Sequence, residues 1–231
     1  MNATIYSHKS VIGTAQLQVS DESMGGVFGL FIPNDNYYKD IQKYIWEFWA
    51  ANKPDYQKWN SLRINVQLDN GLFLFPYGGY TFGDSPDFPD EPKRIDIAGV
   101  DISILRFSKD ILLEPWFTVD IEQKLYFEDE LAREITPIKS FFSLLSFDKM
   151  DNHILVGAEI STFAKYEPND DVLFAVKRKG ENSMLASVHL TWINRKNEQS
   201  SDFPTTHFYS DFNDFVERRM KPDNEDWNFV N

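Results

Sequence analysis

The sequence predicts an α+β fold in which antiparallel sheets are combined with three helical regions. Two observations lead to this prediction. Short segments in which apolar and polar residues alternate, as in half-buried strands, occur in both halves of the chain. Stretches whose apolar residues recur at helical spacing follow the first β segment, occupy the middle of the chain and close it near the C-terminus.

Three strands and then one helix are predicted in the first part of the chain. The strands are expected at 4–6, 13–19 and 27–32. In the second strand, apolar residues occupy every second position from Ala15 to Val19, which is the period of a strand. Apolar residues then recur at helical spacing from Tyr38 to Trp49, so we expect both rings on the buried face of one helix, with Trp46 off that face. A shorter helical turn is expected at 56–59.

The clearest local signal is a β-hairpin around Asn70-Gly71. This pair is favoured in the two-residue type I′ turn, and it lies between two apolar segments. The two strands are expected at 62–68 and 72–77. A two-residue turn places Leu68 opposite Phe73, and the register it sets puts the apolar residues on one face.

The rest of the chain is predicted to alternate between loops, strands and helices. A loop is expected at 76–92, because four prolines and three glycines do not sustain a strand. Strands are then expected at 94–98, 101–107 and 116–121, followed by a helix at 122–134 and an apolar helix or connector at 137–147. A second β region is expected at 154–160, 171–177 and 184–194. The final helix is predicted to begin at Thr205-Thr206 and to end near Met220, before Pro222.

This order of elements suggests three regions. They are a β-rich region with one helix and a central hairpin at 1–110, a helical connector at 111–150, and a β-hairpin with a C-terminal helix at 151–231. A chain of 231 residues fits either one compact unit or two tightly packed halves.

Composition restricts the classes of partner. The net charge is -13, and the chain contains 20 Phe, 10 Tyr and 6 Trp. A negative field repels nucleic-acid phosphates and favours basic partners, so we expect a basic protein partner and no nucleic acid. The chain has no cysteine, no signal-peptide pattern at 1–20 and no run of about 18 apolar residues, which predicts a cytoplasmic location and no membrane partner.

No motif for catalysis, cofactor or metal binding is found in the sequence. The histidines are widely separated, at His8, His153, His189 and His207. No nucleophile elbow, P-loop or dinucleotide-binding glycine pattern is present. We therefore expect no catalytic residue, no metal ligand and no cofactor.

The acidic part of the loop at 76–92 is the predicted binding site. Four carboxylates are expected to steer a basic partner, and two aromatic rings beside them are expected to anchor it. The carboxylates are Asp84, Asp87, Asp90 and Glu91, and the rings are Tyr80 and Phe88. The alternatives are a solvated loop without a partner, and a loop whose oxygens bind a divalent cation.

One segment resembles a known family. Residues 209–216, with the sequence YSDFNDFV, are similar to the closing S-F-x-x-F-L helix of SUKH-type proteins, a superfamily rich in bacterial toxin-immunity proteins. The resemblance covers about ten residues. It implies an immunity function and identifies no binding residues.

The predicted function is that of a non-catalytic acidic protein-binding module, most directly an immunity protein that neutralises a basic toxin by occlusion. Two alternatives of other classes stay open. One is a carboxylate-dependent hydrolase, metal-assisted or glycosidase-like, which would bring two carboxylates together in a hollow. The other is a structural subunit of a homo-oligomer.

Overall fold

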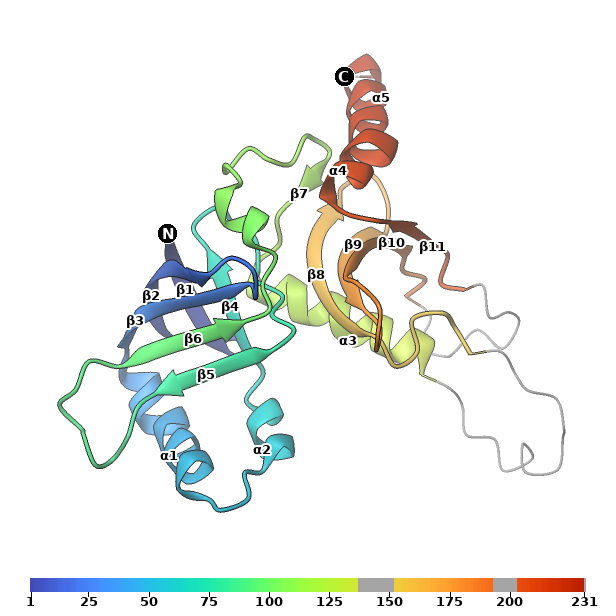
Figure 1. The fold of residues 1–231 in the computed structure, drawn as a ribbon. Coiled ribbons are helices and arrows are strands. Elements are labelled where there is room, and N and C mark those ends of the chain that lie inside the picture. The colour runs from blue at the N-terminus through green and yellow to red at the C-terminus, as the bar shows by residue number, and fades with distance from the viewer. Residues whose placement is uncertain (137–151, 193–202, 231) are drawn as a thin grey trace, which may run out of the picture. The chain divides into compact units, whose positions relative to one another are not determined.

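Two antiparallel sheets with helices form the protein, which confirms the predicted α+β class. A computed structural model describes residues 1–136, 152–192 and 203–230. The chain divides into two units, Met1–Ile111 and Leu112–Asn231, and each is considered by itself (Figure 1). No helix in the described parts of the chain is long and apolar enough to cross a membrane.

The first unit is built on a six-stranded sheet with the spatial order β4-β1-β2-β3-β6-β5, and every neighbouring pair is antiparallel. The strands are β1 (Asn2–Ser7), β2 (Ser10–Asp21), β3 (Gly26–Pro33), β4 (Ile64–Leu68), β5 (Gly79–Gly83) and β6 (Arg94–Ala98). The three strands predicted before residue 33 and the one at 94–98 are confirmed. Alternation predicts them well because one face of the sheet is the core, where Ile5, Leu17 and Phe31 are buried.

Helices follow β3 at the predicted place, but the first begins with a π-helical turn. The elements are the π turn η1 (Tyr37–Ile41), α1 (Gln42–Ala50) and α2 (Tyr56–Ser61). A π turn holds one residue more than an α turn and so rotates the residues before it relative to those after it. Tyr37 is fully buried, whereas Tyr38 and Trp49 are 52% exposed. The prediction that the last two lie on the buried face is wrong.

The predicted hairpin exists in part, with a different register. The Leu68 amide donates to the Leu72 carbonyl at 2.8 Å, and Gln67 lies opposite Phe73. The connection is therefore a three-residue loop, with Gly71 at φ 88°, instead of a two-residue type I′ turn. Asn70 explains the difference, because its side chain is buried and donates to the Phe107 carbonyl at 3.2 Å.

Two further predictions for this unit are wrong. Strand β5 lies inside the segment predicted to be a loop, since no proline falls within Gly79–Gly83 and the buried Phe82 faces the core. The segment predicted as a strand at 101–107 is instead a 3-10 helix, η2 (Ile102–Arg106). Its N-cap is Asp101, whose carboxylate accepts from the Ser103 amide at 3.0 Å, so a local cap outweighs the β-branched composition.

The second unit contains a five-stranded antiparallel sheet with the order β11-β10-β9-β8-β7. Its elements are β7 (Trp116–Phe117), α3 (Ile121–Ile135), β8 (Glu159–Tyr166), β9 (Asp171–Lys177), β10 (Met184–His189), β11 (Thr206–Tyr209), α4 (Phe212–Phe215), the π turn η4 (Val216–Met220) and α5 (Lys221–Val230). Helix α3 belongs to this unit, where the Thr162 hydroxyl of β8 donates to the Lys124 carbonyl. The apolar stretch predicted at 137–147 lies outside the described residues.

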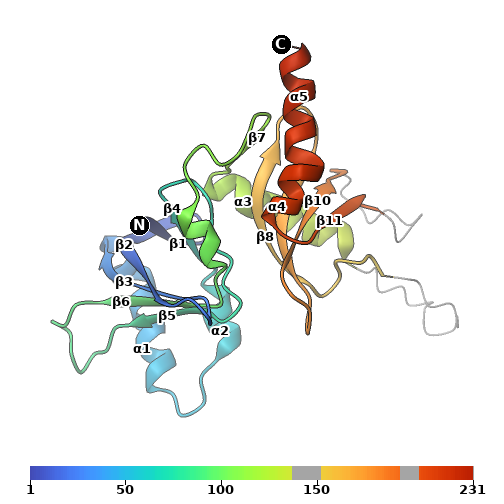
Figure 2. The ribbon, with the colours of Figure 1, turned by 45° about the horizontal axis from the view of Figure 1, so that its top comes forward.

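The C-terminal helix begins later and ends later than predicted. Thr206–Tyr209 form strand β11, and Asp211 is the N-cap that accepts from the Asp214 amide at 2.9 Å. The helix then continues through Pro222 to Val230, and the π turn Val216–Met220 ends two residues before the proline. Figures 1 and 2 show α5 extending away from the sheet, whereas α4 lies close to it.

Other strand boundaries in this unit also shift. The strand predicted at 154–160 begins only at Glu159, after a series of turns, and β10 ends at His189 instead of continuing to 194. Trp192 has a φ of 54°, in the left-handed region that strands do not use.

Candidate partner-binding site

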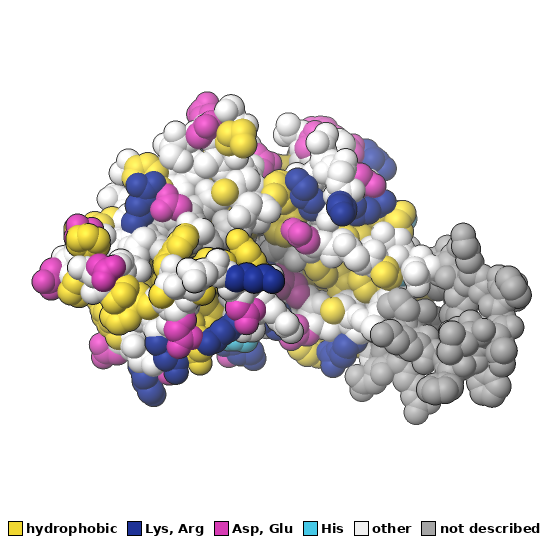
Figure 3. All heavy atoms as spheres, turned by 60° about the horizontal axis from the view of Figure 1, so that its bottom comes forward, with side chains coloured by type: hydrophobic (Ala, Val, Ile, Leu, Met, Phe, Trp, Pro, Cys, Tyr) yellow, Lys and Arg dark blue, Asp and Glu magenta, His cyan; other side chains and the backbone are white. Residues whose placement is uncertain are grey.

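A hollow of about 530 Å³ opens in the first unit beside the predicted acidic loop. Helix α1 contributes Trp49, strand β5 contributes Thr81, Phe82 and Gly83, the loop contributes Asp84, Ser85, Phe88, Glu91 and Pro92, and β6 contributes Arg94 and Asp96. Two of its rings meet solvent, because Trp49 is 52% and Phe88 59% exposed. Figure 3 shows acidic and apolar side chains interspersed on the face of this unit that it displays.

The structure brings together half of the residues predicted from sequence. Asp84, Phe88 and Glu91 line the hollow. Asp87 and Asp90 are exposed on the same loop, outside the lining. Tyr80 lies on β5, where it is half-buried and its hydroxyl donates to the Leu74 carbonyl at 3.2 Å.

Asp84 does not lie at the surface, which corrects the expectation that its carboxylate is available for steering. It is only 6% exposed. Its Oδ2 accepts from the Tyr37 hydroxyl at 2.7 Å and from the Gln42 amide at 3.0 Å, and its Oδ1 lies 3.2 Å from the Lys93 ammonium. This carboxylate therefore joins η1, α1 and the far end of the loop.

The electrostatics of this cluster keep Asp84 charged. Burial acts to raise the pKa of Asp84, but hydrogen bonds from Tyr37 and Gln42, with Lys93 nearby, outweigh it and hold the pKa below its usual value. The Trp46 indole N–H contributes in the same direction, although it makes no hydrogen bond of regular geometry. Burial and the same carboxylate raise the pKa of Tyr37 well above its ordinary value, so that its proton stays in the hydrogen bond.

Lys93 fixes the shape of the loop. Its ammonium pairs with Asp84 at one end and donates to the Pro89 carbonyl at 3.4 Å in the middle. Two consecutive turns form the loop. The Phe88 amide donates to the Ser85 carbonyl at 3.2 Å in the first, and the Glu91 amide donates to the Phe88 carbonyl at 3.2 Å in the second. The exposed carboxylates are therefore presented on a loop whose base is buried and paired.

Trp49 is the member of the site that the sequence analysis missed. Its helical position indicated a buried ring, and Trp46 was expected at the surface instead. In the structure Trp46 is only partly exposed, and the Trp49 indole N–H donates to the Phe82 carbonyl at 2.9 Å. That bond holds the ring at the edge of the hollow.

The loop beside the hollow carries unpaired negative charge. Asp87, Asp90 and Glu91 are exposed and form no ion pair with any base in the described chain. The neighbouring cations are already neutralised, since Lys93 pairs with Asp84 and Arg94 with Asp96. The negative charge that no neighbouring cation balances is therefore carried by Asp87, Asp90 and Glu91 on the loop.

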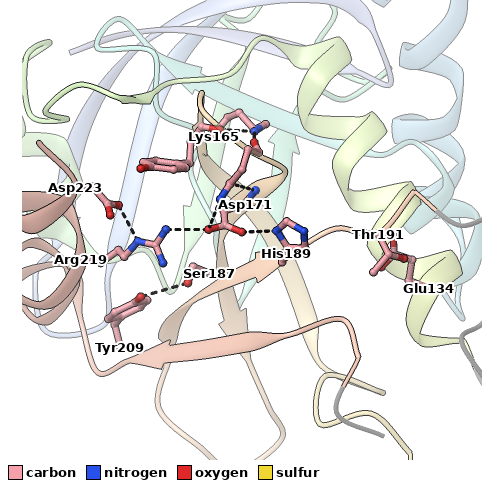
Figure 4. Close-up of polar contacts among 11 residues, drawn as sticks. Glu134, Lys165, Asp171, Ser187, His189, Thr191, Tyr209, Arg219 and Asp223 are labelled. Atoms are coloured by element: carbon pink, nitrogen blue, oxygen red, sulfur yellow. Dashed lines mark hydrogen bonds and ion pairs between the residues drawn. The ribbon is translucent and has the colours of Figure 1, made fainter. Parts of the chain in front are cut away.

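A second polar cluster lies in the second unit and links the sheet to the C-terminal helix (Figure 4). His189 Nδ1 lies 2.8 Å from Asp171 Oδ1, and Arg219 Nη2 lies 2.8 Å from the other oxygen of the same carboxylate. Arg219 Nε also contacts Asp223 at 2.7 Å, and Asp223 accepts from the Trp116 indole at 2.8 Å. The chain of contacts thus connects β7, β9, β10 and the C-terminal helix.

The Asp171–His189 pair resembles the carboxylate–histidine pair of a catalytic site, in which the acid orients a histidine base. Its contacts nevertheless indicate a structural role. Burial acts to raise the pKa of Asp171, yet the hydrogen bond with His189 and the charge of Arg219 hold that pKa below its usual value. The nearest candidate nucleophile on the same face of β10, Ser187, is buried with its hydroxyl 3.2 Å from that of Tyr209. Within the described residues, no group of three His, Asp or Glu side chains is placed to hold a metal ion.

Helix α3 also buries two carboxylates. Glu130 and Glu134 are 3% and 5% exposed. Glu134 Oε1 accepts from the Thr191 amide at 2.7 Å and from the Trp192 amide at 2.9 Å. Burial raises the pKa of Glu134, while these backbone bonds act in the opposite direction. The two bonds give Glu134 a structural role at the end of β10.

No family model, curated protein or solved structure matches this chain.

Proposed function

We propose that the protein is a non-catalytic, acidic protein-binding module and that the hollow beside loop 84–93 is its binding surface. One observation carries this proposal: two half-exposed rings, Trp49 and Phe88, line the same hollow as the unpaired carboxylate of Glu91. Exposed aromatic side chains in a concave site are the residues that most often dominate the binding free energy of protein interfaces.

The charge of the loop supplies the second part of the mechanism. Unpaired carboxylates around an aromatic centre accelerate association with a basic partner and disfavour acidic ones. Because the base of the loop is fixed by the Asp84–Lys93 pair, little conformational entropy is lost when the partner docks. Binding at such a surface acts by occlusion, since a partner held over the hollow cannot engage its own target through the same face.

The biological role that fits this binding mode is that of an immunity protein which neutralises a basic toxin in the cytoplasm. The similarity of residues 209–216 to the closing helix of SUKH-type proteins supports this role, as does the net charge of -13. The absence of cysteine is compatible with a reducing compartment.

The experiment is an affinity capture from native lysate with quantitative mass spectrometry, at low and at high salt. The wild-type chain is compared with a double variant, Trp49→Ala with Glu91→Lys, and with the control Glu225→Lys. Glu225 is exposed on α5 of the second unit and does not line the hollow, so the control reverses one charge outside its lining. A basic protein that is retained by wild type and control at low salt, and lost from the double variant and at high salt, supports the proposal. Equal retention of every captured protein by all three chains contradicts it.

A further inference from the structure

We propose that the hollow recognises an arginine side chain of the partner, with the guanidinium lying against the Trp49 ring and meeting the Glu91 carboxylate. This inference rests on the proposed protein-binding function and specifies the chemistry of its central contact.

The aromatic surface is preorganised for a cation. The bond from the Trp49 indole to the Phe82 carbonyl fixes the ring plane, and an edge contact with Phe48, with centroids 5.5 Å apart, supports it from the helix. Half of the Trp49 surface is nevertheless exposed. Tryptophan is the ring that attracts cations most strongly, through the negative potential of its face.

The same unit already covers neighbouring rings with its own cations. The Arg94 guanidinium carbon lies 4.5 Å from the centroid of Phe28, and Lys58 Nζ lies 4.7 Å from that of Tyr44. No cation of the described chain lies over Trp49 or Phe88, although both rings are exposed beside an acidic loop. A cation from a partner would therefore give these two rings the same cation–π contact that Phe28 and Tyr44 receive from the protein itself.

Charge and shape together favour arginine over other side chains. Glu91 is a carboxylate at the rim without a basic partner in the described chain, so it offers a bidentate acceptor to a guanidinium. Arginine is planar and weakly hydrated, so it stacks on a ring while it pairs with a carboxylate, whereas the compact, strongly hydrated lysine ammonium loses more on leaving water. An apolar side chain would cover the rings but would leave the Glu91 charge without a partner.

The test uses short peptides and the intact chain. Three blocked heptapeptides, Gly-Ser-Gly-X-Gly-Ser-Gly with arginine, lysine or the neutral isostere citrulline at X, are titrated into the ¹⁵N-labelled protein, and the indole N–H resonance of Trp49 is followed by NMR. A Trp49→Phe variant assigns that resonance. We expect a saturable shift with the arginine peptide and binding about tenfold weaker with the citrulline peptide, since the cation–ring contact and the carboxylate pair are both lost. Glu91→Gln and Phe88→Ala are expected to weaken arginine binding, whereas Glu225→Gln is not.

Two results overturn the inference. One is an arginine peptide that leaves the Trp49 resonance unmoved, and the other is a citrulline peptide that shifts it equally well. Neither result decides the proposed function, which depends on whether a captured protein requires Trp49 and Glu91. If such a protein is captured and still binds after its arginines are blocked with phenylglyoxal, the protein-binding function stands and the arginine contact is excluded. The spectra themselves show whether each variant is folded, so a loss of binding is not confused with unfolding.

Discussion

Asp84 and Lys93 form a buried ion pair at the two ends of one loop, with Oδ1 and Nζ 3.2 Å apart. The two side chains are 1% and 7% exposed. The acids between them, Asp87, Asp90 and Glu91, are all exposed. One acid of the cluster is therefore structural, and it determines how the other three are presented.

Asp84→Asn is expected to destabilise the protein strongly. The amide keeps the size of the side chain but leaves Lys93 as a buried charge without a carboxylate, and breaking a buried pair in this way costs about 3–5 kcal/mol. Chemical denaturation followed by tryptophan fluorescence measures the free energy of unfolding. Asp87→Asn, on the exposed part of the same loop, is the matched control and is expected to change it by about 0.5 kcal/mol or less. Similar losses in the two variants would show that the pair is not a source of stability.

The stabilisation by Asp84 is expected to depend on pH in a defined direction. The folded-state pKa of Asp84 lies below its ordinary value, so the unfolded chain binds this proton more readily than the folded one. The contribution is therefore fully present above the unfolded-state pKa, about 3.9, and is lost as the pH falls through the folded-state value. The difference in free energy of unfolding between wild type and Asp84→Asn should be constant near neutral pH and should shrink in acid. A difference that grows as the pH falls would refute this assignment.

Arg219→Ala is expected to loosen the C-terminal helix without unfolding the first unit. Arg219 bridges Asp171 and Asp223, and its loss removes charge-assisted bonds worth about 1.5–3 kcal/mol. Hydrogen exchange measured by mass spectrometry should increase in 212–230 and stay unchanged in 1–111. Arg218→Ala provides the comparison, because Arg218 is 60% exposed and makes its pair with Asp214 and its bond to the Phe208 carbonyl at the surface, outside the network of Asp171. An equal increase of hydrogen exchange at 212–230 in both variants would mean that the contacts of Asp171 do not stabilise the C-terminal helix.

Phe215→Ala is expected to remove much of the packing between the helix and the sheet. Phe215 is fully buried and makes edge contacts with Trp116 and Tyr209, at centroid distances of 5.0 and 5.3 Å. Truncating a buried phenylalanine costs about 3–5 kcal/mol. Phe229→Ala removes the same side chain from a position that is 93% exposed, and we expect little change in the thermal unfolding of that variant. A comparable fall in the melting temperature of both would contradict the observed packing.

Sequence periodicity predicted the regular parts of the fold for a physical reason. Strands such as β2 and β3 have one face in the core, so their apolar residues alternate and can be recognised without tertiary information. Helix α3 was found for a similar reason, because apolar residues at helical spacing, among them Phe127, Leu131 and Ile135, form its buried stripe.

What could not be predicted depends on contacts between distant residues. Asn70 turns inward to bond Phe107, which changes the register of the hairpin. Asp84 reads as one acid among several in the sequence, and only the approach of Tyr37 and Lys93 distinguishes it. Three of the six predicted residues, Asp84, Phe88 and Glu91, line the hollow. Trp49 was missed because it follows the buried Ile45 by one helical turn in α1, so its spacing alone does not report its exposure.

The π turn before helix α1 makes the surface sensitive to insertions and deletions during evolution. The turn at Tyr37–Ile41 amounts to one inserted residue, and one residue corresponds to about 100° of rotation around a helix. Deleting one residue from this turn would restore a regular α-helix. The residues after the turn would then be rotated relative to those before it, so the exposed ring of Trp49 would point in a different direction. The proposed binding face and the orientation of helix α1 therefore depend on the same few residues, and a length change in that turn would alter the proposed face without altering any residue of it.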